Sequence, residues 1–190
     1  MTVLPIRITG DPVLHRRAAP VPAEAFGPPL ERLARDMRET MLAAPGVGLA
    51  GPQVGVDARI FVWGWTDPDG ARHEGTVVNP VLVADPVAAG DADPAAESEG
   101  CLSVPGHQFP LRRSAHAVLT GVDAAGAPVR VEARGWLARI FSHEFDHLEG
   151  LLYVDRLASP WAERARAVVE EAGWGVPGRS WLPGSGPSRH

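Results

Sequence analysis

Apolar residues recur at helical spacing in three stretches of the chain. The first starts after Pro28-Pro29 and runs to about Ala44, and four of its apolar side chains form one stripe: Leu30, Leu33, Met37 and Met41. The second covers residues 136–149 and is followed by a glycine, and the third covers residues 161–172. The spacing therefore predicts three helices, the first with its stripe toward the core.

Between the first and second helices the pattern changes to one typical of β-strands. The predicted strands are residues 60–63, 76–78, 81–83, 116–123 and 128–134. Residues 84–97 are rich in Ala, Pro and Asp, and we expect them to form an exposed acidic loop. No linker divides the chain, so we expect a single domain over residues 1–172. Residues 173–190 are rich in Gly, Pro, Ser and Arg and are expected to be a flexible C-terminal tail.

Composition and charge narrow the class of protein. With 190 residues, 45% of them hydrophobic, the chain is long enough to bury a core. The net charge of −5 argues against generic binding to nucleic acid or anionic membranes, and no nucleic-acid motif is found. No apolar run has the length of a membrane span or of a signal peptide. We therefore expect a soluble, cytoplasmic protein.

Two residue types limit the chemistry. All 18 basic residues are arginine, so Schiff-base chemistry and the lysine of a P-loop are excluded. Cys101 is the single cysteine. An internal disulfide and a zinc site with several cysteines of one chain are therefore excluded as well.

The strongest motif is His143-Glu144-Phe145-Asp146-His147 in the second predicted helix. Histidines four residues apart project from one helix face and can hold one metal ion, and Glu144 is close enough to act on water there. The alternative is a helix with two surface histidines and two solvated acids. Apolar residues on both sides indicate partial burial, which would be costly for these groups without a metal or partners.

Two histidines need a third ligand, and Cys101 is the leading candidate, although a lone cysteine is usually an inert small hydrophobe. One thiolate and two imidazoles would leave a position open for water, which is a catalytic arrangement. Such a donor set accepts Fe2+, Zn2+, Co2+ or Ni2+, so the residues do not choose the metal. A carboxylate from Glu163 or Glu170, as in a zinc peptidase, is the competing third ligand.

Residues 46–55 contain four glycines and indicate a tight loop. They do not form a dinucleotide fingerprint, because they follow a helix. Three segments together resemble the peptide deformylase family. Its GxGLAxxQ, EGCLS and HExDH motifs match residues 46–53, 99–103 and 143–147 in that order, and the resemblance covers roughly residues 5–157.

The resemblance implies an α+β fold with antiparallel β-sheets packed around a central metal-binding helix. It implies a metallohydrolase of protein biosynthesis that removes the N-terminal formyl group from N-formylmethionyl nascent polypeptides and releases formate. The implied ligands of a divalent metal ion are Cys101, His143 and His147. In the cell that ion is expected to be Fe2+, with Zn2+, Ni2+ or Co2+ able to replace it. The implied partners are formylmethionyl peptides on nascent chains at the ribosome.

The metal would supply hydroxide near neutral pH, and Glu144 would accept the water's proton and pass it to the departing amine. By resemblance, the Gln53 amide and the Leu102 backbone N–H stabilise the oxyanion. We expect the substrate backbone to pair with the Val47-Gly48 edge. Val47 and Ile140 are candidates for the methionine pocket, or else plain core residues.

Asp146 is expected to pair with an arginine such as Arg113; orienting a ligand histidine is the alternative. Two other functions remain open: a zinc peptidase with a carboxylate third ligand, and a noncatalytic metal-stabilised binding protein. Cys101→Ala and Glu170→Ala distinguish the peptidase from the deformylase by which of the two abolishes metal binding. The presence of Gln53 and Glu144 argues against a noncatalytic protein.

Overall fold

The structure, a computed structural model, describes residues 2–184. Its helices are α1 (Pro28–Ala43), α2 (Trp136–Leu148) and α3 (Trp161–Glu171), and four short 3-10 helices join other elements. The strands are β1 (Ile6–Arg7), β2 (Gly48–Ala50), β3 (Ile60–Thr66), β4 (Arg72–Ala84), β5 (Ser98–Cys101), β6 (Val104–Pro110), β7 (His116–Val122), β8 (Pro128–Arg134) and β9 (Ser180–Trp181). The α+β fold with antiparallel sheets is confirmed.

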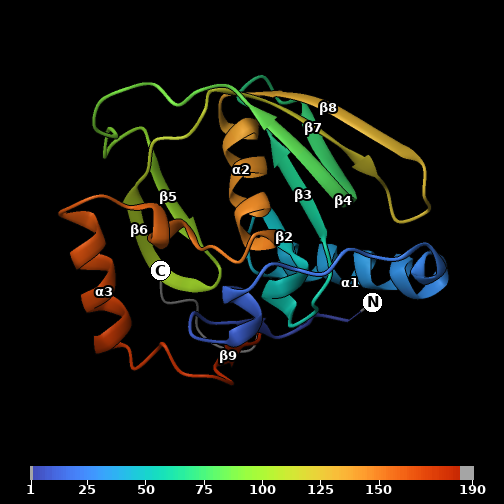
Figure 1. The fold of residues 1–190 in the computed structure, drawn as a ribbon, viewed down its shortest axis with the longest axis horizontal. Coiled ribbons are helices and arrows are strands. Elements are labelled where there is room, and N and C mark those ends of the chain that lie inside the picture. Colours follow the sequence, from blue (N-terminus) through green and yellow to red (C-terminus); the bar gives the residue numbers. More distant parts are fainter. Residues whose placement is uncertain (1, 185–190) are drawn as a thin grey trace.

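Five strands form one antiparallel sheet in the order β2-β3-β4-β7-β8, and β5 and β6 form a separate hairpin. Figure 1 shows α2 between this sheet and the β5–β6 hairpin, with α3 beyond the hairpin. The sheet side of α2 is apolar: Phe141 packs against Phe61 and Trp63 with ring centroids 5.1–6.1 Å apart. The helix is therefore covered on two sides, which places its polar residues in the interior.

The three predicted helices are confirmed, but α1 begins two residues before the expected start, at Pro28, because proline is tolerated in the first turn of a helix. The other helix ends lie within one residue of those expected. The predicted strands at 76–78 and 81–83 are parts of one strand, β4, whose pairing with β7 shifts between Val78 and Val81. Asn79 lies within the interruption: its φ is 49°, and its side chain bonds both backbone groups of Val21 at 2.8 and 2.9 Å. Residues 84–97 are largely exposed, as expected for the acidic loop.

The C-terminal segment differs from the expected flexible tail. Ser180–Trp181 forms β9, which pairs antiparallel with β1. The Trp181 side chain packs on the hydrophobic cluster that includes Leu30, Met37 and Met41, called the core cluster of α1 below. Long-range pairing of a two-residue strand leaves no periodic signal, so composition alone was misleading for residues 173–184. The last residues of the predicted tail, 185–190, lie outside the described part. Within residues 2–184, no helix is long and apolar enough to cross a bilayer.

Candidate metal centre

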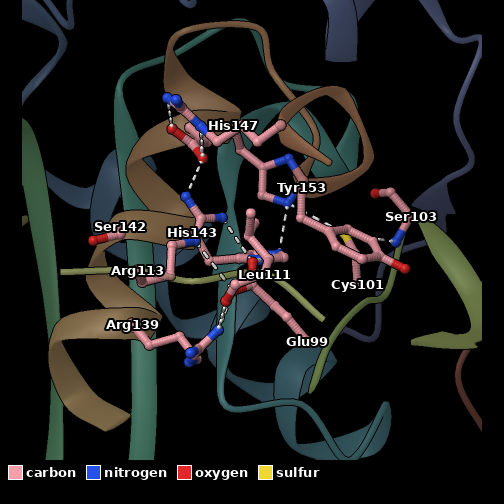
Figure 2. A network of polar contacts seen from close by, with 12 residues as sticks. Glu99, Cys101, Ser103, Leu111, Arg113, Arg139, Ser142, His143, His147 and Tyr153 are labelled. Carbon is pink, nitrogen blue, oxygen red and sulfur yellow. Dashed lines mark hydrogen bonds and ion pairs between the residues drawn. The ribbon is translucent and has the colours of Figure 1, made fainter. Parts of the chain in front are cut away.

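Three predicted ligands lie together at the centre of the molecule. Cys101 comes from the end of β5, and His143 and His147 come from one face of α2 (Figure 2). Their donor atoms lie within 4.8 Å of one another. The His147 Nε2 atom is 3.2 Å from His143 Nε2 and 3.3 Å from Cys101 Sγ. Metal bonds of 2.0–2.3 Å in a tetrahedron separate ligand atoms by roughly 3.4 Å, so the three atoms fit one small ion.

Glu99 orients one of these histidines. Its Oε1 accepts a hydrogen bond from His143 Nδ1 at 2.7 Å, so the Nε2 lone pair of His143 faces the cluster. Glu99 is 5% exposed. Burial alone would raise its pKa, but hydrogen bonds from His143 and Arg113 hold the pKa of this carboxyl well below its usual range. The Glu99 carboxylate is therefore a fixed acceptor.

The role of Glu99 was missed from the sequence, although it belongs to a recognised motif. Its position two residues before Cys101 on a strand was the available signal, since such residues share a side. The residues that hold it come from elsewhere: Arg139 Nη1 donates to Glu99 Oε2 at 3.0 Å and to the Leu111 carbonyl at 2.6 Å (Figure 2). Arg139 therefore ties α2 to β5 and to the segment after β6.

The expected pair of Asp146 with Arg113 is confirmed, with Arg113 Nη1 2.6 Å from Asp146 Oδ2. Arg156 adds a second donor to the same carboxylate, its Nε also at 2.6 Å. Arg113 bonds Glu99 as well, at 2.7 Å. These ion pairs, buried except for the half-exposed Arg156 side chain, fix the C-terminal half of α2 against β5, the strand of Cys101.

Glu144 lies beside the cluster and is 3% exposed. Its Oε2 atom is buried and has no hydrogen-bond partner among residues 2–184. Burial raises the pKa of Glu144 to about 7; His143 opposes the rise and the negative charge of Glu99 adds to it. A carboxyl group with such a pKa can accept and return a proton near neutral pH.

Gly48 is the residue of β2 that makes room for Glu144. A Cβ atom at position 48 would lie 2.2 Å from the Glu144 Oε1 atom. On the neighbouring strand β3, the Gly64 N–H donates to the Val47 carbonyl. In an antiparallel pair, residues whose backbone groups bond the neighbouring strand alternate with residues whose backbone groups point away from it. The N–H and C=O of Gly48 therefore point away from β3, toward the free edge of the sheet. An extended peptide could pair there.

The predicted oxyanion donors lie next to Cys101. Gln53 is 1% exposed, and its Oε1 accepts the Ala50 N–H at 2.8 Å. This bond directs the Gln53 amide nitrogen toward Cys101 Sγ, at 3.7 Å, and toward Ser103 Oγ, at 3.4 Å. Leu102 follows Cys101 in the turn of the β5–β6 hairpin, where its side chain packs on the core cluster of α1.

The remaining predicted site residues differ in how far their side chains are exposed. Val47 is 38% exposed, directly before β2. Ile140 is 3% exposed in the core cluster shared by α2 and the sheet, which supports the alternative of a plain core residue. Glu163 and Glu170 are exposed on α3. In the described part of the chain, the group of residues able to hold a metal contains neither of them.

The comparisons with known proteins point to one family. The model of the polypeptide deformylase family matches residues 3–162. The peptide deformylase of Mycolicibacterium paratuberculosis is 49% identical over an alignment of 192 positions, which covers 98% of this chain and 98% of that protein.

Solved structures are similar as well. The peptide deformylase of Thermus thermophilus has a TM-score of 0.70 and 38% identity, covering 90% of this chain and 93% of that one. The enzyme from Acinetobacter baumannii, solved with Met-Ala-Ser bound, has a TM-score of 0.71 and 33% identity. That match covers 82% of this chain and 98% of the other.

Proposed function

The chain belongs to the polypeptide deformylase family and is a hydrolase that removes the N-terminal formyl group from new polypeptides; from this premise we propose how its residues perform the reaction. Three buried donors of suitable type and spacing, beside a buried carboxyl group with an unpartnered oxygen, are the observation that carries the proposal. The zinc peptidase and the noncatalytic protein are disfavoured by the same comparisons.

The family uses a divalent metal ion. We propose that Cys101, His143 and His147 hold it, and that it is Fe2+ in the cell, with Zn2+, Ni2+ or Co2+ able to replace it. Two borderline nitrogen donors and one soft sulfur suit each of these ions. When bound, the ion would act as a Lewis acid toward the formyl carbonyl and water.

Glu144 moves the proton in this proposal. Its unpartnered Oε2 accepts a proton from the attacking water and later gives it to the departing amine. The raised pKa of Glu144, about 7, matches both directions of transfer near neutral pH. The contact with Gly48 keeps the carboxylate in one place between these steps.

Gln53 and Leu102 stabilise the developing oxyanion. The Gln53 amide is held by Ala50 with its nitrogen toward the cluster, so it is preorganised before the substrate arrives. The Leu102 backbone N–H is the second donor, on the turn after Cys101. Preorganised donors of this kind each contribute about 10²–10³ in rate.

We propose that the substrate lies in extended form along the free edge of β2 and bonds the backbone of Gly48. Backbone pairing tolerates any sequence after the first residue, as a general N-terminal processing enzyme requires. The Acinetobacter baumannii enzyme was solved with Met-Ala-Ser, and we propose that this chain binds peptides of the same kind. Val47 and Ile140 line the methionine pocket in this proposal. The support from Val47 is stronger, because its side chain is exposed and that of Ile140 is buried.

We place the enzyme in the cytoplasm, acting on chains that emerge from the ribosome, because formylated N-termini arise during translation. We retain one catalytic domain for residues 1–172, and the pairing of β9 with β1 favours including the following residues up to Trp181.

The test of the proposed function is formate release from formyl-Met-Ala-Ser by anaerobically prepared, metal-loaded protein. We expect formate and Met-Ala-Ser in equal amounts. Cleavage of an internal peptide bond without formate release would instead identify a peptidase.

A further inference from the structure

We propose that Trp181 is a positioning residue of this active site: its indole fixes the Leu102–Ser103 peptide group, and through that group the Cys101 sulfur. The inference rests on the function proposed above for Cys101. Trp181 belongs to the segment expected to be a flexible tail, and no site motif includes it.

The first observation is a hydrogen bond across 79 residues of sequence. The Trp181 Nε1–H donates to the Leu102 carbonyl oxygen at 2.9 Å. Both side chains also pack against the core cluster of α1. The indole is therefore held by packing while its one polar atom contacts the turn after the ligand cysteine.

The second observation is what lies on the other side of that peptide group. The Leu102 C=O and the Ser103 N–H share one planar peptide unit and point in opposite directions. The Ser103 N–H donates to Cys101 Sγ at 3.4 Å. The indole N–H, the peptide group and the sulfur are thus linked in series. A bond to the carbonyl polarises the peptide and makes its N–H a better donor to the sulfur.

The third observation is that the two chain ends together hold this turn. The Thr9 N–H donates to the Ser103 carbonyl at 2.9 Å, one residue beyond the carbonyl that Trp181 holds. Thr9 in turn accepts the Gly175 N–H at 3.1 Å, and Ile8 donates to the Arg179 carbonyl at 3.0 Å. Both carbonyls of the turn are therefore held by the paired ends of the chain.

The segment that carries the indole is itself paired and closely packed. In the β1–β9 pair, Trp181 lies opposite Ile6, which is fully buried. Near this pair the chain ends pass so closely that a Cβ atom at Gly10, whose φ is 98°, would lie 2.3 Å from the Gly175 backbone. A side chain carried by such a segment can set the orientation of a peptide group and not merely cover it.

The experiment compares wild type, Trp181→Phe and the control Trp65→Phe, all loaded with Zn2+ to the same occupancy. Phe keeps an aromatic ring and removes the N–H. Trp65 stacks on His73, the residue opposite it in the β3–β4 pairing, near the end of β3. Leu102-Ser103 is the only Leu-Ser pair in the sequence. Labelling Leu with carbonyl ¹³C and Ser with ¹⁵N therefore gives one amide signal that reports this peptide group.

In Trp181→Phe we expect the Leu102 carbonyl resonance to move upfield and the Ser103 amide signal to shift. We expect kcat for formyl-Met-Ala-Ser to fall about fivefold with KM within about twofold, since one neutral hydrogen bond is lost. Trp65→Phe should change neither quantity. A general loss of structure would reduce the metal-loaded fraction but not kcat per loaded site.

An unchanged carbonyl resonance in Trp181→Phe, or a moved resonance with unchanged kcat, would overturn the inference. If Trp181→Phe does not fold, the indole is replaced by benzothiophene, which has the same shape and no N–H, with the same expected and contrary results. A wild type that releases no formate would count against the proposed function instead, so the two failures are distinguishable.

Discussion

Gly48→Ala is the substitution with the most specific expected result. The added Cβ would lie 2.2 Å from the Glu144 Oε1 atom, 2.6 Å from its Cδ and 2.8 Å from its Cγ. Ordinary contact begins at about 3.4 Å, so the Glu144 carboxylate must move by roughly 1 Å. Misplacement of a catalytic group by about 1 Å costs about 10²-fold in rate. We expect kcat to fall by about that factor.

Alanine keeps the backbone N–H and C=O of position 48, so KM for formyl-Met-Ala-Ser should stay within about threefold. The assay is steady-state formate release at matched metal occupancy. Gly64→Ala on the neighbouring strand is the matched control, because a Cβ there meets only the terminal methyl of Met41, at 2.9 Å. A Gly48→Ala enzyme with kcat within about threefold of wild type would refute the argument that this contact fixes Glu144.

Three further results follow from the site. Cys101→Ala should reduce bound metal well below one ion per chain, measured by elemental analysis, whereas Glu170→Ala should leave it unchanged; the reverse pattern would favour a carboxylate ligand. Asp146→Ala removes one of the two carboxylate partners of Arg113, whose side chain is 7% exposed and keeps Glu99, and should lower the free energy of unfolding in urea by about 2–3 kcal/mol. Arg156→Ala, with 44% of that side chain exposed, should lower the free energy of unfolding by about 1 kcal/mol or less. Equal losses of stability in the two variants would contradict the argument that burial decides the cost. Removing the metal with a chelator should stop formate release and lower the melting temperature, both restored by Zn2+, because an ion bound only by the folded state stabilises it; a melting temperature that does not change would contradict a site formed by these donors.

The sequence predicted those parts of the molecule whose signals are local. The stripe of Leu30, Leu33, Met37 and Met41 defined α1, and the two histidines of the HExDH segment share a helix face by spacing alone. The short strands were not predictable in this way. In β2 and β5 the pattern contains glycine and alternates too briefly, and the β5–β6 pairing shifts at Cys101.

Roles that depend on distant partners were also beyond the sequence. Glu99 acts through His143 and Arg139, which are 44 and 40 residues away, so only the folded chain shows that it orients the His143 ring. Trp181 lies in a stretch whose Gly and Pro content is typical of a flexible tail, yet a two-residue strand and one indole N–H connect it to the site. In both cases tertiary pairing overrides the local composition.

The central claim is that Glu144 moves the proton beside a metal held by Cys101, His143 and His147. Its most direct test compares formate release by wild type and Glu144→Gln at equal metal occupancy. Gln keeps the shape and cannot accept the proton, so we predict unchanged metal binding and a kcat about 10²–10⁴-fold lower. A Glu144→Gln enzyme that binds the metal and releases formate at the wild-type rate would contradict the claim.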